Sequence, residues 1–392
     1  RAVYGRPYRT KGAAWEDNMG YFPFFIDLAG RAGLVVGGGS TALRKLEKLI
    51  RAAGIENIDF ANRFTALKLH FGEEGNLAYL RPNYVKVVAD VVKSLGGVPF
   101  LTDCNTLYVG SRKNAIDHLD VAALHGFGPL TTGCQVIIAD GLKGTDEILV
   151  PVPCGEYVQE AKIGHAIMDA DIIISVNHFK GHEQAGFGGA LKNLGMGCGS
   201  RAGKMEQHAS GKPHVLEKLC TGCRACVRQC AHDAITYGRN GKAAIDHGKC
   251  VGCGRCLGAC NFDAINPPSD HSCDILCKKM AEYAWAVLEG RPHFHISLVI
   301  DVSPFCDCHG ENDIPLIPDV GFFASFDPVA LDQACADACN KMPPMAGSVI
   351  QDSDPAADRF ASAFPETRWQ VCLEHAEKLG VGSRAYELVT VK

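Results

Sequence analysis

The chain has 392 residues, of which 47% are hydrophobic and 21% are charged, enough for a large core and more than one compact unit. Its formal net charge of −5 provides no basic surplus for binding nucleic acid or an anionic membrane surface. No run of about 18 apolar residues appears, and the N-terminus lacks the layout of a secretory signal, so we expect a soluble, cytoplasmic protein without nucleic-acid or membrane partners.

The first recognisable feature is a strand-like run, a Gly-rich turn and a helical run at residues 33–50. Gly37, Gly39 and Ala42 have the spacing of a turn that seats a pyrophosphate at a helix N-terminus. The segment resembles the opening of precorrin-2 dehydrogenases of sirohaem synthesis. The similarity ends near Ala53, and no clear second strand precedes Asp59, so we do not expect a complete NAD site. The segment could instead be a β–α unit that completes the main sheet, or a remnant of a fused protein.

Between about residues 55 and 200, apolar runs alternate with amphipathic ones, as in a layered α/β domain. Strands are predicted at 65–70, 98–101, 135–139 and 171–176, and helices at 82–95 and 114–125. After a Cys-rich segment, a helix and a strand are predicted at 275–288 and 296–302. We therefore predict an α/β fold, with a mixed or parallel sheet and helices on both faces. Residues 1–211 and 269–392 form it, and residues 212–268 are an insert.

A Gly-rich loop at residues 177–208 follows the strand at 171–176. Ligands bind at the carboxyl ends of strands in open α/β sheets, and glycines let them approach the backbone. A structural loop with solvated charges is the alternative, but the histidines in the loop favour a ligand or catalytic site. His70, at the end of the strand 65–70, is a further candidate. The other candidate cofactor-binding residues are Lys180, Gly186, Gly188, Gly189, Arg201 and Lys204.

Two runs of four cysteines repeat with the spacing C-x₂-C-x₂-C-x₃-C. Such a run delivers soft thiolates from a short turn, as an iron–sulfur cubane requires. Zinc is the alternative, but the identical spacing of both runs disfavours it. An Asn240-Gly241 turn between apolar residues predicts a hairpin between the runs.

This pattern resembles two-cluster bacterial ferredoxins, although Ala231 and Asn261 stand where ferredoxins have proline. The resemblance implies an inserted α+β domain with two [4Fe–4S] clusters, each bound by three cysteines of one run and the last cysteine of the other. One cluster would bind Cys220, Cys223, Cys226 and Cys260, and the other Cys250, Cys253, Cys256 and Cys230.

Cys306 and Cys308 follow the strand at 296–302, so their thiols are candidates for the same cleft. They could ligate a further metal, act as a redox dithiol, or be two reduced thiols in a turn. The pairs Cys273/Cys277 and Cys335/Cys339 have helical i,i+4 spacing, and we expect them to be packing residues.

Two wider resemblances are carried by longer segments. "LKLHFGEEGN", "PFLTDCNTLYVGSR", "ADGLKGTDE" and "DVGFFASFDPVALDQACADACNK" resemble the iron–sulfur proteins grouped as domain of unknown function 362, from about Phe64 to the C-terminus. The loop "HFKGHEQAGFGGALKNLGMGCGSRAGKMEQH" supports the same family and also resembles the cofactor segment of nickel-pincer lactate racemases. That second resemblance implies Lys192 as a cofactor-attaching lysine, His208 as a metal ligand and His182 as a proton-transfer base.

We therefore predict an iron–sulfur redox protein of low-potential, anaerobic metabolism. Its two [4Fe–4S] clusters would transfer electrons to or from a cofactor or substrate in the α/β domain. The expected partner is a redox protein or a small-molecule electron donor or acceptor. The sequence is also compatible with a further bound cofactor or metal and with assembly into a homo-oligomer. The alternatives are a non-enzymatic electron carrier or cluster-delivery protein, and an isomerase-like site related to nickel-pincer racemases.

Overall fold

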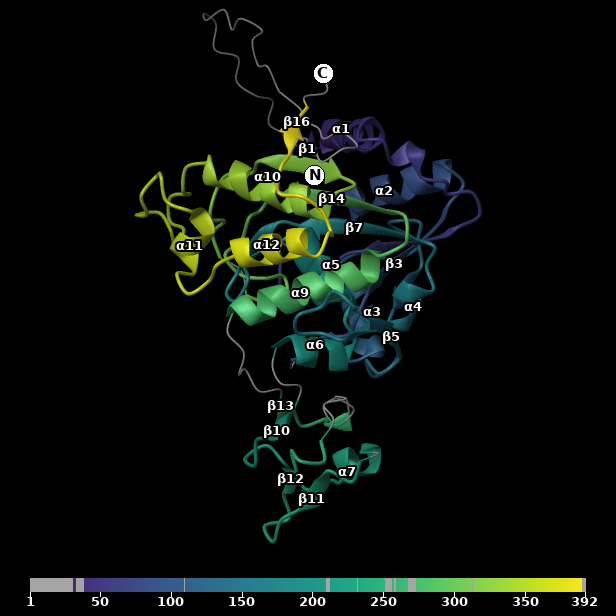
Figure 1. The fold of residues 1–392 in the computed structure, drawn as a ribbon, viewed down its shortest axis with the longest axis vertical. Helices are drawn as coiled ribbons and strands as arrows, with labels where there is room; N and C mark the ends of the chain where they lie inside the picture. The colour runs from purple at the N-terminus through teal and green to yellow at the C-terminus, as the bar shows by residue number, and fades with distance from the viewer. Residues whose placement is uncertain are drawn as a thin grey trace, which may run out of the picture.

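A six-stranded mixed sheet is the centre of the molecule (Figure 1). The computed structural model describes residues 31–32, 39–108, 110–208, 212–230, 232–250, 256, 259–266, 273–311 and 313–389. The strand order is β15-β14-β7-β2-β3-β4, and all neighbours are parallel except β14 and β15. The strands are β2 (Phe64–Lys68), β3 (Val98–Asp103), β4 (Val136–Ile138), β7 (Ile172–His178), β14 (His293–Val299) and β15 (Gly321–Ser325).

Helices cover both faces of this sheet, as predicted. Strand residues alternate between the faces, so Ile173 of β7 packs into one apolar core while Ile172 and Ile174 pack into the other. The first core is covered by α5 (Ala190–Cys198), α9 (Cys273–Leu288), α10 (Pro328–Asn340) and α12 (Gln370–Lys378). The second is covered by α1 (Gly39–Ala52), α2 (Pro82–Ser94) and α3 (Ala115–Leu124).

Helix boundaries follow local capping chemistry. The Asn114 side chain accepts hydrogen bonds from two backbone N–H groups in the first turn of α3, and the Asp327 side chain does the same for α10. Pro328 then occupies the first turn of α10, where its missing N–H costs nothing. Among the residues that the structure describes, the helices are all too short or too polar to span a bilayer.

The N-terminal segment does not extend the main sheet in its described part. The predicted helix is present as α1, but the strand-like run at 34–36 and Gly37 lie outside the described residues. The nearest described strand, β1 (Arg31–Ala32), pairs in parallel with β16 (Glu387–Leu388). The other described elements outside the Cys-rich segment are η1 (Ile55–Asn57), β5 (Glu147–Pro151), β6 (Glu160–Gly164), α4 (His165–Met168), β8 (Lys180–His182), β9 (Gly186–Gly188), α6 (Arg201–His208) and α11 (Arg359–Ala363).

The Cys-rich segment forms a small lobe beside the α/β body, drawn below it in Figure 1. It contains two antiparallel pairs, β10 (His214–Val215) with β13 (Ile265–Asn266) and β11 (Ile235–Tyr237) with β12 (Ala243–Ile245), and the helix α7 (Ala225–Gln229). The predicted hairpin is therefore confirmed, and Gly241 adopts φ +72° in its turn. Pro267 and Pro268 lie outside the described residues.

Candidate functional site

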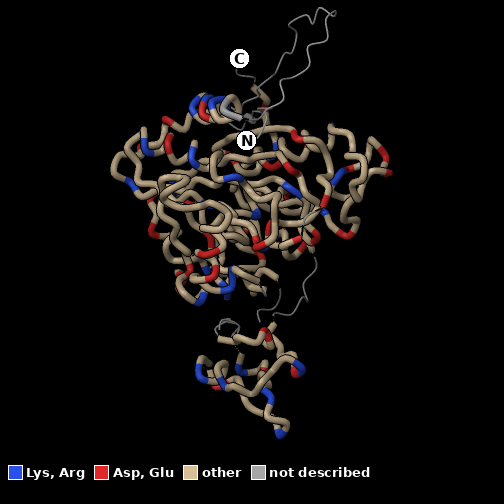
Figure 2. Tube along the Cα trace, turned by 180° about the vertical axis from the view of Figure 1, so that it is seen from behind, with Lys and Arg blue, Asp and Glu red and all other residues tan. Residues whose placement is uncertain are grey.

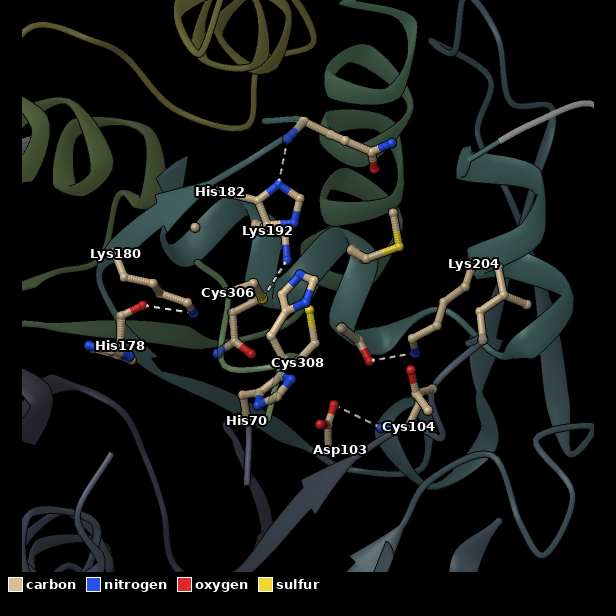
Figure 3. A pocket seen from close by; sticks show the side chains of 18 of the residues that line it. His70, Asp103, Cys104, His178, Lys180, His182, Lys192, Lys204, Cys306 and Cys308 are labelled. Carbon is tan, nitrogen blue, oxygen red and sulfur yellow. Dashed lines mark hydrogen bonds between the residues drawn. The ribbon is translucent and has the colours of Figure 1, made fainter. Parts of the chain in front are cut away.

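A cavity of about 450 Å³ opens at the carboxyl ends of three parallel strands. Lys68 is the last residue of β2, Asp103 of β3 and His178 of β7, and all three side chains line the cavity. Figure 3 shows Asp103 and His178 at this site. Because parallel strands end at the same edge of a sheet, residues far apart in sequence meet here.

The Gly-rich loop folds into the β8–β9 hairpin and α5, and close packing explains several of its glycines. A Cβ at Gly181 would lie 2.3 Å from the carbonyl oxygen of Pro304, and one at Gly189 would lie 2.3 Å from Oδ1 of Asp332. Asp332 accepts hydrogen bonds from the first two N–H groups of α5, at 2.7 and 2.9 Å. This cap fixes the start of the helix that carries Lys192 into the cavity.

Most of the predicted α/β site residues line this one cavity. Those that do are His70, Lys180, His182, Gly188, Gly189, Lys192, Lys204, His208, Cys306 and Cys308. Gly186 and Arg201 lie outside its lining. Gly186 adopts φ +78° beside Trp369. The buried guanidinium of Arg201 donates to the carbonyl oxygens of Thr106 and Lys113, so it holds a loop rather than facing the cavity.

Three polar side chains surround the sulfur of Cys306. Lys192 Nζ donates to Cys306 Sγ at 3.4 Å. Hydrogen bonding by Cys308 and His182 also lowers the pKa of Cys306. The Nδ1 atom of His182 accepts from the N–H groups of Gln184 and Ala185, both at 3.1 Å, so Nε2–H is the group that His182 has available to donate.

The electrostatics of these groups favour a Cys306 thiolate. The hydrogen bond from Cys308, followed by the charges of Lys192 and Lys180, holds the pKa of Cys306 well below its usual range despite burial. The pKa of Cys308 is raised well above its usual range, because its proton lies in that hydrogen bond and the thiol is buried. Burial would lower the pKa of Lys192, but the charge on Cys306 raises it instead.

Acidic residues pair with the cavity's lysines and histidines. Buried Asp307 lies 2.8 Å from His178 Nδ1 and 3.3 Å from Lys180 Nζ. Burial would raise the pKa of Asp307, but these two neighbours hold it well below the usual value. Burial, together with the nearby charge of Lys192, lowers the pKa of His208 to about 3. His208 is therefore neutral near pH 7 and available as a hydrogen-bond partner.

A buried ion pair closes the floor of the cavity. Lys68 Nζ lies 3.0 Å from Asp103 Oδ1 and donates to Asn193 Oδ1 at 2.7 Å. Arg112 approaches the other oxygen of Asp103 at 3.8 Å and pairs with Glu73 at 3.0 Å. Burial would raise the pKa of Asp103, but the charge of Lys68 holds it well below its usual value.

Lys68, Arg112 and Glu183 also line the cavity, although none of them is predicted as a site residue from the sequence. Lys68 could have been recognised from the sequence, because it is a charged residue inside a predicted buried strand. Arg112 and Glu183 lie in connections and enter the site only through the fold.

Four cysteines of the small lobe line a second, smaller cavity: Cys220, Cys223, Cys226 and Cys260. Backbone N–H groups point at two of their sulfurs, from Ala243 to Cys220 at 3.5 Å and from Ala264 to Cys260 at 3.3 Å. Ala234 N–H likewise points at Cys230 Sγ, at 3.4 Å. Cys253 lies outside the described residues. In the described part of the chain, no three His, Cys, Asp or Glu side chains are arranged to hold a single metal ion.

The small lobe contacts the rim of the first cavity. Leu107 lines that cavity and also packs in the apolar cluster of the lobe, which includes Cys256 and Cys260. Met205 of α6 packs in the same cluster. Lys113 Nζ donates to the carbonyl oxygen of Cys260 at 2.8 Å and pairs with Asp263.

Comparison with known proteins identifies one family. The model of the family described as "Domain of unknown function (DUF362)" matches residues 65–337. No curated protein matches the chain. The lactate racemase apoprotein from Thermoanaerobacterium thermosaccharolyticum has a TM-score of 0.37 and 11% identity, over 71% of this chain and 56% of its own. A protein from Thermotoga maritima has a TM-score of 0.39 and 11% identity, over 77% of this chain and 60% of its own. The chain therefore spans less than two thirds of either structure.

Proposed function

The chain belongs to the DUF362 family, and we propose that it is an iron–sulfur redox protein. Its Cys-rich lobe would bind two [4Fe–4S] clusters, and electrons would pass between this lobe and a substrate held in the cavity at the ends of β2, β3 and β7. The observation that carries the proposal is the second cavity. It brings Cys260 of the second run together with three cysteines of the first run, the set that a two-cluster arrangement requires.

The donor set suits an iron–sulfur cluster. Thiolates are the soft ligands that iron–sulfur clusters use, and backbone N–H groups directed at the Cys220 and Cys260 sulfurs would stabilise them in the charged form. When bound, such clusters supply one-electron transfer. The second cluster would use Cys250, Cys253, Cys256 and Cys230.

The contact between lobe and body supports a short path for electrons. Leu107 touches both the cysteine cluster and the large cavity, and Met205 lies on α6 beside Lys204, which lines the cavity. Cluster and substrate would therefore be separated by a few side chains rather than by a solvent gap.

The chain's own residues would bind and orient the substrate. Lys192 and Lys204 present ammonium groups to the cavity, which favours an anionic substrate. Desolvation lowers the pKa values of His208 and His70, so both would be uncharged at neutral pH and able to accept a hydrogen bond or a proton from the substrate.

The surface charge of the lobe favours an acidic redox partner protein. Between residues 212 and 266, Lys and Arg outnumber Asp and Glu by eight to four, although the whole chain is acidic. Figure 2 shows lysines and arginines on the outer loops of this lobe. Such a charge difference would steer an acidic partner to the lobe and away from the body.

The test is metal content after anaerobic purification. We expect about eight iron atoms and eight sulfides per chain, and interacting [4Fe–4S]⁺ signals in electron paramagnetic resonance of the dithionite-reduced protein. Cys260→Ala should lower the iron content to about half or less. Cys277→Ala, which removes a buried thiol of α9 outside both runs, should retain it. Zinc in place of iron, or full iron content in Cys260→Ala, would overturn the assignment.

A second measurement separates an enzyme from an electron carrier. Small molecules released from the native protein are identified by mass spectrometry. A stoichiometric anionic molecule that is lost in Lys204→Ala supports a substrate or cofactor site. A protein that holds only clusters, and binds no anionic metabolite in solution, favours the carrier instead.

A further inference from the structure

The pair Cys306 and Cys308 differs from the other described thiols in its surroundings. Burial raises the pKa values of Cys198, Cys335 and Cys339, which lie in helices. Cys306 is equally buried, yet Lys192 donates to its sulfur at 3.4 Å, its pKa is lowered instead of raised, and it faces a cavity large enough for a small molecule. A buried thiol that serves only packing has no need of an ammonium group at hydrogen-bonding distance.

The two thiols also have complementary protonation states. Lys192 Nζ lies 3.4 Å from Cys306 Sγ, so negative charge is favoured on Cys306, which is the nucleophile, while Cys308 holds the proton of the pair. The charged and titratable groups that face Cys306 from the surrounding elements are His70, Lys180, His182, Glu183, Lys192 and His309.

We propose that Cys306 and Cys308 form a redox-active dithiol that exchanges with a small anionic disulfide bound in the large cavity. The Cys306 thiolate attacks one sulfur of the substrate disulfide, forms a mixed disulfide and releases the first substrate thiolate. Cys308 then transfers its proton to the first released thiolate and attacks Cys306, which closes the Cys306–Cys308 disulfide and releases the second thiolate. The substrate disulfide is reduced by two electrons and the protein dithiol is oxidised by two.

The cavity determines the class of substrate. Lys192 lies beside the attacking sulfur, and Lys204, whose ammonium donates to the carbonyl oxygen of Gly199 at 2.6 Å, lies elsewhere in the lining. Ammonium groups at separate points favour a molecule with several carboxylates around its disulfide. Exchange consumes no electron from an iron–sulfur cluster, so this inference extends the proposed function and does not depend on it.

The experiment uses the native, anaerobically purified protein with glutathione disulfide as the probe. After reaction, free thiols are blocked and the protein is digested with chymotrypsin. Cleavage after Phe305 and Leu316 yields a peptide that contains Cys306 and Cys308 but neither Cys335 nor Cys339. We expect this peptide to lose two hydrogens, while Cys335 and Cys339 stay alkylated. An unchanged peptide after prolonged exposure would overturn the proposal.

Two cysteine variants establish the order of attack. In Cys308→Ser the mixed disulfide cannot be resolved, so Cys306 should retain one glutathionyl group. In Cys306→Ser the group should be absent. Glutathionylation of Cys308 in Cys306→Ser at the wild-type rate would contradict the assigned nucleophile. Cystamine, a cationic disulfide, should react at least tenfold more slowly than glutathione disulfide, and an equal rate would refute the anionic substrate class.

The role of Lys192 is tested by the rate at which iodoacetamide alkylates Cys306 at pH 6. Lys192→Met removes the ammonium beside the sulfur and should slow alkylation about tenfold. Lys162→Met is the matched control, because Lys162 pairs with Glu206 outside the cavity, and its rate should stay within twofold of wild type. Equal rates for both variants would contradict the thiolate arrangement. Iron content, measured on the same samples, reports separately on the proposed function.

Discussion

Replacing Asp103 tests the buried ion pair at the floor of the cavity. The side chains of Lys68 and Asp103 are 1% and 3% exposed, and their charged atoms lie 3.0 Å apart. At an effective dielectric constant of about 20, their attraction is about 5.5 kcal/mol. Desolvation opposes this attraction, so the pair adds little over an apolar pair, but removing one partner leaves the other charge buried. Asp103→Asn should therefore lower the free energy of unfolding by about 3–5 kcal/mol.

Replacing Lys68, the other partner of the ion pair, should lower the free energy of unfolding by less. In Lys68→Met, Asp103 keeps Arg112 at 3.8 Å, and the methionine fills the space of the lysine stem, so we expect a loss of about 1–3 kcal/mol. The double variant Lys68→Met/Asp103→Asn should lose less free energy of unfolding than the sum of the losses in the two single variants. Asp90→Asn, in an exposed helical pair with Lys86, is the control and should change the value by less than about 0.5 kcal/mol.

The assay is urea unfolding at pH 7 under anaerobic conditions, followed by far-ultraviolet circular dichroism. The variants are compared through the transition midpoint and its slope. The reasoning fails if Asp103→Asn stays within about 1 kcal/mol of wild type, or if Lys68→Met is the more damaging change.

Three further predictions concern packing and titration. Burial raises the pKa of Asp332 to about 7, so the contribution of Asp332 to stability falls as the pH rises from about 4 to about 7. Asp332→Asn should remove that part of the pH dependence of the free energy of unfolding. Curves of stability against pH that run parallel for wild type and variant would contradict this. Gly195→Ala would place a Cβ 2.1 Å from the carbonyl oxygen of Met280 and force α5 away from α9. We expect the free energy of unfolding, measured by thermal unfolding, to fall by about 1–3 kcal/mol. An unchanged unfolding midpoint would refute this prediction. Glu282→Ala leaves the N–H groups of residues 156–158 without their acceptor, so these amides should exchange hydrogen with solvent much faster than in wild type. Unchanged exchange rates would contradict this prediction.

The local spacing of apolar residues was sufficient to predict most strands of the main sheet and several of the helices that cover it. The predicted strands at 65–70, 98–101, 135–139 and 171–176 match β2, β3, β4 and β7 to within two residues at each end. The helices α2, α3 and α9 were located with similar accuracy. The antiparallel edge strand β15 was not predicted, because its identity depends on pairing with β14 and its five residues carry no alternation of their own.

The candidate site was predicted in outline and completed only by the fold. His70, Lys192 and Cys306 were chosen because they follow strands or lie in a Gly-rich loop, and all three line the cavity. Gly186 and Arg201 were chosen by the same reasoning and lie outside its lining, because their roles are to pack on Trp369 and to hold a loop. The spacing of a motif indicates which residues are near one another in the chain, not which way each side chain points.

The sequence by itself determined the α/β class, the family, and two cysteine runs whose spacing is suited to iron–sulfur clusters. These properties depend on periodicity and on spacing within a few residues. Only the tertiary structure brought Lys192 of α5 and His182 of β8 to the sulfur of Cys306, and Lys68 of β2 to Asp103 of β3. Contacts between groups so far apart in sequence depend on how the strands are ordered in the sheet, and local sequence preferences do not determine that order.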